Sequence, residues 1–347
     1  MSEVLAKVYR GKTVESIHLG SVAVMDSSGK LVYLVGDPNF VTFLRSSAKP
    51  FQAIPVVESG VAEAFGFTQQ EIAIISGSHN GEKKHVRTVQ SILKKIGLNK
   101  SYLQCGTHVP HYYTASGITP PKKKFSPLEH NCSGKHVGML AICVYKGWNL
   151  KNYLDPRHLV QRLDLKMISE FCEYPEKRIK IGIENCGAPT FALPLKNMAI
   201  GFSKLVTFRS KHEITSQALQ VVADSMWKYP KMVSGRKRLD YELAVASKGN
   251  ILSKGGAEAL HCAAILNEGY GLAVKIMDGS QRAIAPASIE VYRQLGILKK
   301  SHLKELKELV SPPIYNHKKV KVGFIKSDFQ FACCCRVPLP RNISGSG

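Results

Sequence analysis

The stretch Ser46-Ser47-Ala48-Lys49-Pro50 is the first of three short elements that together indicate a fold for this 347-residue chain. On a helix, residues three apart share one face, so the amine of Lys49 can reach the hydroxyl of Ser46. A serine becomes a good nucleophile when a base takes its proton. A lysine can be that base when burial or a second cation lowers its pKa. Alone the pattern decides little, because Ser46 could equally be the N-cap of an ordinary helix.

The second element is Ser76-Gly77-Ser78-His79-Asn80-Gly81-Glu82. It follows an apolar run at 70–76, which we expect to be a buried strand, and precedes a helix predicted over 82–96. Such a loop offers hydroxyls and backbone donors at a helix N-terminus. A helix cap formed by Ser78 or Asn80 explains the same residues equally well.

The third element is Ser253-Lys254-Gly255-Gly256, at the start of a segment over 256–267 that we expect to be helical. The three elements read Ser-x-x-Lys, Ser-x-Asn and Lys-x-Gly in chain order. That set is typical of active-site serine acyl-transfer enzymes. There, the first serine attacks a carbonyl, the first lysine is the base, and the second serine and lysine relay protons.

Around these elements, strands and helices alternate to the end of the chain. The pattern predicts strands at 20–26, 30–36, 178–183, 272–277 and 319–325, and helices at 135–145 and 213–227. Since the two kinds of element interleave, we expect one α/β unit over residues 1–347, with a mixed sheet flanked by helices and one or two lobes. Residues 331–347 are expected to be a flexible tail.

The composition is that of a globular protein, with 44% hydrophobic and 21% charged residues. It excludes a disordered chain, a fibrous repeat and a small disulfide scaffold. No apolar run reaches the roughly 18 residues of a membrane helix, so no membrane partner is expected. Nine cysteines without regular spacing, and charges at the N-terminus, favour a reducing cytoplasm.

The net charge of +22 is the one unusual bulk property. The basic runs are scattered along the chain, and no known nucleic-acid motif accompanies them. We therefore favour a solvated lysine-rich surface, and nucleic acid is not an expected partner. The alternative is a non-catalytic protein that binds polyanions, which steeply salt-dependent binding would reveal.

Two cysteines lie in polar loops, Cys132 in the run HNCSGKH at 130–136 and Cys186 in the run ENCGAP at 184–189. Four others lie beside apolar or helical sequence, as is usual for buried thiols: Cys105, Cys143, Cys172 and Cys262. Two thiolates and a nitrogen donor can hold zinc with one open position. Four clear ligands are not apparent, so the residues alone leave a metal site open.

Together, the runs RSSAKPFQAIP, SHNGE, HNCSGKH, ENCGAP, MVSGRKRLD and SKGGAE closely resemble the Rhizobium etli-type (thermolabile) L-asparaginases, the asparaginase II family. The resemblance extends from about residue 9 to 330, in family order. It implies hydrolysis of asparagine to aspartate and ammonia, a fold similar to serine β-lactamases and serine-type glutaminases, and a homodimer.

The resemblance also implies site residues. It pairs Ser46 with Lys49, and Ser78 with Lys254, as the catalytic groups. It assigns a zinc ion near the substrate to Cys132, Lys135, Cys186 and a water, with zinc orienting the substrate. It places the substrate-binding residues at Arg45, Asn80, His136 and Glu184.

One departure stands out, because Glu184-Asn185 replaces the expected aspartate and glycine before the second cysteine. This affects the expected geometry around the substrate amine and the metal. A β-lactam-directed or glutamine-directed serine hydrolase built from the same elements remains the main alternative.

Overall fold

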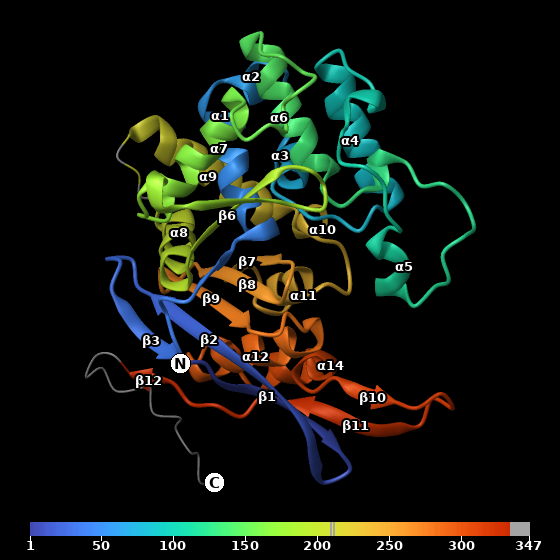
Figure 1. Ribbon diagram of the computed structural model, residues 1–347, viewed down its shortest axis with the longest axis vertical. Coiled ribbons are helices and arrows are strands. Elements are labelled where there is room, and N and C mark those ends of the chain that lie inside the picture. The colour runs from blue at the N-terminus through green and yellow to red at the C-terminus, as the bar shows by residue number, and fades with distance from the viewer. Residues whose placement is uncertain (209, 211, 334–347) are drawn as a thin grey trace.

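The computed structural model describes residues 1–208, 210 and 212–333 (Figure 1). Its strands are β1 (Glu3–Arg10), β2 (Thr13–Met25), β3 (Leu31–Val35), β4 (Val41–Phe43), β5 (Lys180–Ile183), β6 (Pro189–Pro194), β7 (Ile251–Gly256), β8 (Leu260–Ile265), β9 (Tyr270–Ile276), β10 (Pro313–Tyr315), β11 (Lys321–Lys326) and β12 (Ala332–Cys333). Its α-helices are α1 (Lys49–Glu58), α2 (Val61–Ala64), α3 (Gln69–Ile75), α4 (Lys83–Lys95), α5 (His111–Ser116), α6 (Ser133–Lys146), α7 (Leu159–Phe171), α8 (Leu195–Thr207), α9 (Glu213–Lys228), α10 (Pro230–Val233), α11 (Leu239–Ala246), α12 (Gln281–Gln294), α13 (Lys300–Glu305) and α14 (Lys307–Val310). No helix within these residues is long and apolar enough to span a membrane.

The main sheet has the strand order β10-β11-β1-β2-β9-β8-β7, with β3 pairing β2 and β12 pairing β3. Every pairing between described strands is antiparallel. Strands β1 and β2 lie near the centre of the sheet, and the chain adds β7, β8 and β9 to it after the helices of residues 49–246. Of these three strands β9 pairs with β2, so β7, which carries Lys254, lies at one end of the strand order.

The central strands are buried on both faces because their side chains alternate between two cores. In β2, Ala23 and Met25 join the core shared with the helices of residues 49–228, whereas Val22 and Val24 join the core beneath α12. Figure 1 shows this layering, with α1, α6, α7 and α9 on one side of the sheet and α12 on the other. The predicted α/β class, a sheet flanked by helices, is confirmed, but the described strand pairs are antiparallel where a mixed sheet was expected.

A small sheet of order β4-β6-β5 lies between the main sheet and the helices. Beyond its paired strands, Leu44 donates a backbone hydrogen bond to Phe191 (2.9 Å) and Arg45 donates one to the Thr190 hydroxyl (3.1 Å). This fixes the residues before Ser46 against the 184–190 loop. Two motifs far apart in the sequence are thereby brought together.

Two sequence predictions were wrong. The run at 70–76 is not a strand but helix α3, which Thr68 and Glu71 start with a reciprocal capping box. The segment 256–267 is not a helix but the end of β7, a turn and β8, with Glu258 and Ala259 at positive φ (58° and 50°) in the turn. The central parts of both segments, 71–76 and 259–265, are buried at every residue, and a mostly apolar run of this kind has no period that separates helix from strand.

The other predicted elements are confirmed within a few residues, including helices α4, α6 and α9 and the β2–β3 hairpin. The predicted tail, residues 331–347, lies mostly outside the described residues. Of its first residues, Ala332 and Cys333 pair with Leu34 and Tyr33 of β3.

Candidate functional site

The first element sits where a short 3₁₀ helix, η1 (Arg45–Ala48), runs directly into α1. Arg45 has a positive φ of 49°, which a non-glycine residue adopts only at a cost. Lys49 is the first residue of α1 and is fully buried, whereas Ser46 is partly exposed. The serine therefore faces accessible space and the lysine lies behind it.

The amine of Lys49 donates hydrogen bonds to the Ser78 hydroxyl (2.7 Å) and to the Cys132 sulfur (3.2 Å). Among the described residues, the Ser46 hydroxyl makes no hydrogen bond. The structure therefore differs from the predicted pairing of Ser46 with Lys49. In tertiary space, the first lysine contacts the second serine.

Ser78 is held by its backbone, since its N–H donates to the Val233 carbonyl (2.7 Å). A Cβ on Gly77 would lie 2.6 Å from the Met232 carbonyl oxygen and 2.8 Å from that of Val233. The loop thus packs directly against the backbone after α10, which only glycine permits at this position. Neither Ser78 nor Asn80 caps α4, whose N-cap is Glu82.

Lys254 is fully buried on β7 and does not hydrogen-bond to Ser78, in contrast to the second predicted pairing. Its amine donates to the Gly255 carbonyl (2.7 Å) and lies 3.8 Å from the Asp240 carboxylate. Burial lowers the pKa of Lys254 to about 8; Lys49 and Arg238 add to this, while Asp240 opposes it.

Asp240 was not identified from the sequence, although it lies within the quoted run MVSGRKRLD. Its carboxylate accepts hydrogen bonds from the Ser253 hydroxyl (3.0 Å) and the Gly255 N–H (2.9 Å), and it lies 3.9 Å from His261. Burial acts to raise the pKa of Asp240, but Lys254, His261 and the Gly255 N–H outweigh it and lower that pKa. A buried carboxylate therefore compensates the positive charge of the second lysine.

Ser46 and Ser78 line one cavity of about 500 Å³. The rest of the wall comes from α5, from the segment leading into α11, and from β7 with the residues that follow it. These lining residues include His111, Thr114, Ala115, Lys237, Arg238, Asp240, Gly255, Gly256, Ala257 and His261. All three predicted elements thus meet at a cavity large enough for a small amino acid. Asn80, also predicted to bind substrate, does not line it; its carbonyl oxygen instead accepts from Arg238 (3.4 Å).

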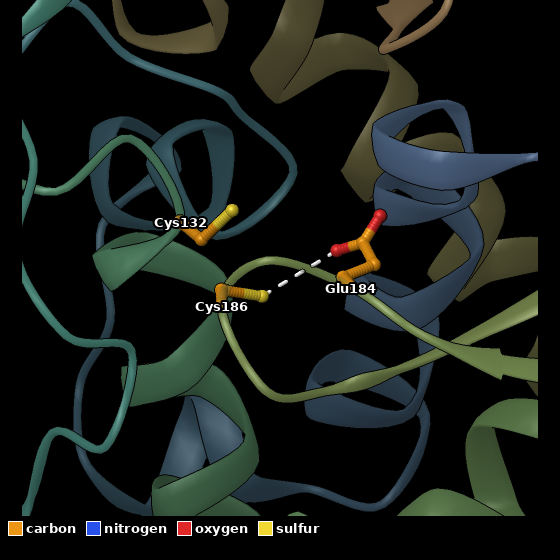
Figure 2. A group of neighbouring side chains, drawn as sticks. All are labelled: Cys132, Glu184 and Cys186. Atoms are coloured by element: carbon orange, nitrogen blue, oxygen red, sulfur yellow. Dashed lines mark hydrogen bonds between the residues drawn. The ribbon is translucent and has the colours of Figure 1, made fainter.

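The two cysteines in polar loops lie close together in the structure, as the resemblance implies. Sulfur atoms of Cys132 and Cys186 and a carboxylate oxygen of Glu184 lie within 4.8 Å of one another, and all three residues are buried (Figure 2). Cys132 directly precedes α6, and the Cys186 thiol donates to Glu184 (3.4 Å). A hydrogen bond from Cys186 and the nearby Lys49 amine hold the pKa of Cys132 well below its usual range, against the effect of burial.

Lys135 and Glu184 form a buried ion pair beside these sulfurs, with 2.9 Å between the amine and the carboxylate. The Nε of Arg45 lies 3.5 Å from the other carboxylate oxygen of Glu184, and its Nη2 donates a hydrogen bond to the side-chain oxygen of Asn185 (3.0 Å). Both residues that depart from the family pattern, Glu184 and Asn185, therefore bind Arg45. Four groups here could bind a metal: two thiols, one carboxylate and one amine. The two thiols together with the carboxylate, or with the amine, form a donor set that suits zinc.

His136 is fully buried, and its Nδ1 is hydrogen-bonded to the Tyr153 hydroxyl (2.7 Å), which also accepts from the Gln104 N–H. No described residue bonds to its Nε2. His136 does not line the cavity. The four cysteines expected in the core, Cys105, Cys143, Cys172 and Cys262, are buried and free.

The sequence profile of the family described as L-asparaginase II matches residues 6–327. A comparison with curated proteins finds no match.

Solved structures with similarity include Mglu in its native form (TM-score 0.43, 12% identity, covering 82% of this chain and 67% of that chain). They also include a Bacillus glutaminase (TM-score 0.37, 11% identity, covering 80% and 91%) and a beta-lactamase candidate from Bacteroides dorei (TM-score 0.41, 9% identity, covering 79% and 93%). Since the family profile spans most of the sequence, the chain belongs to the L-asparaginase II family.

Proposed function

We propose that this protein hydrolyses L-asparagine to L-aspartate and ammonia through a covalent acyl-enzyme. The observation that carries the proposal is the 2.7 Å hydrogen bond from the buried Lys49 amine to the Ser78 hydroxyl, at a cavity that Ser46 also lines. A serine, a lysine base and a second serine at one cavity are the groups that acyl transfer needs. Membership of the L-asparaginase II family supports the substrate.

In the proposed reaction, Ser46 is the nucleophile because it is the more exposed of the two serines. Its oxygen attacks the side-chain amide carbon, and its proton passes to Lys49. The Lys49–Ser78 hydrogen bond then delivers a proton to the amide nitrogen, which leaves as ammonia. The backbone N–H of Ser46, at the start of η1, would donate to the oxyanion. Water cleaves the ester, restores the Ser46 hydroxyl and releases aspartate.

In this proposal Lys254 acts from β7, which packs against η1. With a pKa of about 8, its amine exchanges protons near neutral pH, and Asp240 stabilises the protonated form. We propose that the neutral amine, which forms as the pH rises, accepts and returns protons beside the Lys49–Ser78 pair.

We also propose a zinc ion at Cys132 and Cys186, with a third donor from the Lys135–Glu184 pair. The fit rests on the two buried thiols and the carboxylate within 4.8 Å. Bound there, zinc would supply a fixed positive charge that orients the substrate. Lysine can ligate only as the neutral amine, so its ion pair with Glu184 would have to break.

An ammonia-release assay on L-asparagine and L-glutamine, with and without a chelator, tests the activity. A faster rate on glutamine, or turnover of a β-lactam, would favour the alternative serine hydrolases. A homodimer and a cytoplasmic location, both expected from the sequence, belong to the same proposal, and sedimentation analysis measures the first.

A further inference from the structure

The positive charges around the cavity differ in whether they are already compensated. Lys49 donates to Ser78 and Cys132, and Lys254 lies 3.8 Å from the Asp240 carboxylate. Arg45, the arginine expected to bind substrate, faces Glu184 at 3.5 Å. These three cations are therefore engaged inside the protein.

Arg238 is different. It lines the cavity and is largely buried, yet no carboxylate forms an ion pair with it in the part of the chain that the structure describes. Its one side-chain hydrogen bond is a long one of 3.4 Å from Nη1 to the Asn80 carbonyl oxygen. The nearby Asp240 carboxylate favours the charge of Arg238 through space, but it accepts its hydrogen bonds from Ser253 and the Gly255 N–H. A guanidinium at a cavity that makes no hydrogen bond to a carboxylate is suited to an anionic group on a ligand.

Asn80 holds the loop that presents this arginine. Its side-chain amide nitrogen donates to the Arg236 carbonyl (3.2 Å), while its oxygen accepts from Arg238. A Cβ on Gly235, which has a φ of 108°, would collide with the same amide. The loop thus wraps closely around Asn80, which makes Asn80 a positioning residue for Arg238 and not a substrate contact.

We propose that Arg238 binds the α-carboxylate of the substrate and so restricts the site to amides that carry a free carboxylate. The proposal rests on the function proposed above and adds a specificity-determining residue to it. A guanidinium forms two parallel hydrogen bonds with a carboxylate, which fixes orientation as well as charge. With the carboxylate at Arg238, the side-chain amide would extend along the cavity toward Ser46 and Ser78, which line the same cavity.

The test compares L-asparagine with 3-aminopropanamide, which is asparagine without its α-carboxylate. In the Arg238→Met variant, we expect kcat/KM for asparagine to fall about 10- to 100-fold, mostly through KM, as for the loss of a charged hydrogen-bonding group. The rate on 3-aminopropanamide should stay unchanged, so the preference for asparagine collapses. Arg238→Lys should retain part of the preference for asparagine, because lysine keeps the positive charge. Asn80→Ala should raise KM for asparagine with little change in kcat.

Matched variants separate the neighbouring cations. Arg236 is exposed and does not line the cavity, so Arg236→Met should leave both substrates unaffected. Lys237 is exposed but lines the cavity; if Lys237→Met carries the loss and Arg238→Met does not, the proposal is overturned.

Calorimetric binding of L-aspartate and β-alanine provides a readout that does not depend on turnover. We expect the wild type to prefer L-aspartate and Arg238→Met to lose that preference. A wild type that binds L-aspartate but hydrolyses no amide contradicts the proposed function alone. An active wild type whose Arg238→Met and Arg238→Lys variants keep the full preference contradicts the carboxylate assignment alone.

Discussion

The amine of Lys49 lies 2.7 Å from the hydroxyl of Ser78, and neither side chain is more than 2% exposed. The base of the first element is thus joined to the serine of the second, 29 residues further along the chain. Ser46 is partly exposed and lines the same cavity as Ser78. Because only Ser78 accepts a hydrogen bond from Lys49, substitutions at the two serines should have different effects on the reaction.

Replacing each serine distinguishes nucleophile from proton relay. Ser46→Ala should lower kcat for asparagine by about 10⁴-fold or more and prevent a covalent adduct, because no other atom would form the ester. Ser78→Ala should also slow the reaction but still accumulate adduct on Ser46, detectable by mass spectrometry. Ser59→Ala, whose hydroxyl bonds only the Pro55 carbonyl, is the control. An adduct that survives in Ser46→Ala but not in Ser78→Ala would assign the attack to Ser78.

Lys49→Met should abolish activity and also lower the stability of the protein. The amine is the base in the proposed reaction, and its removal leaves the buried Ser78 hydroxyl and Cys132 sulfur without their shared donor. Ammonia release and the thermal unfolding midpoint measure the two effects. Near-normal turnover would show that Lys49 is not the base.

The pH dependence should follow Lys254. Its pKa of about 8 is lowered by burial first, and the neutral amine forms as the pH rises through that value. We therefore expect kcat/KM to increase from neutral to alkaline pH. Asp240→Asn removes the carboxylate that raises the pKa of Lys254, so the midpoint should move to lower pH. The control Asp155→Asn, at a partly exposed residue that does not line the cavity, should leave the midpoint in place. An optimum near pH 5 would contradict lysine base chemistry.

Zinc content should depend on the two thiols. The double variant Cys132→Ser, Cys186→Ser should lose zinc by elemental analysis and bind asparagine more weakly, while remaining folded. Lys135→Met and Glu184→Gln show which side chain supplies the third donor, since only the variant that removes a ligand lowers occupancy. Occupancy should also fall on acidification, as protons compete for the thiolates. Cys105→Ala is the control, and unchanged zinc in the double variant would exclude this site.

Gly77→Ala tests the packing that places Ser78. The added methyl group would lie 2.6 Å from the Met232 carbonyl oxygen, a backbone atom that cannot easily move. We expect a loss of stability of about 1–3 kcal/mol and a marked fall in kcat, because the loop must shift. Ser76→Ala, in the same loop, removes only a hydrogen bond to the Ile72 carbonyl and should keep kcat. Unchanged unfolding and turnover in Gly77→Ala would show that the loop adapts.

Candidate site residues could be named from the sequence because short local runs carry the residue types that acyl transfer and metal binding need. Ser46, Lys49, Ser78 and Lys254 were identified from motif order, and Cys132 and Cys186 from their polar neighbours. Arg238 and Asp240 were missed, although they stand in a quoted run, because nothing local separates a cavity-lining charge from an exposed one. Their positions depend on where α11 packs against β7.

By itself, the sequence determined the α/β class, the β2–β3 hairpin and helices such as α4, whose apolar residues keep a clear period. It could not assign 70–76 and 256–267, since runs that are buried at every residue, here 71–76 and 259–265, lack the alternation that distinguishes helix from strand. Only the tertiary structure decided which lysine meets which serine. Spacing along the chain suggested that Lys49 contacts Ser46. The packing of η1 against the 76–82 loop instead places the Lys49 amine at the Ser78 hydroxyl, and the position of β7 places the Lys254 amine near the Asp240 carboxylate.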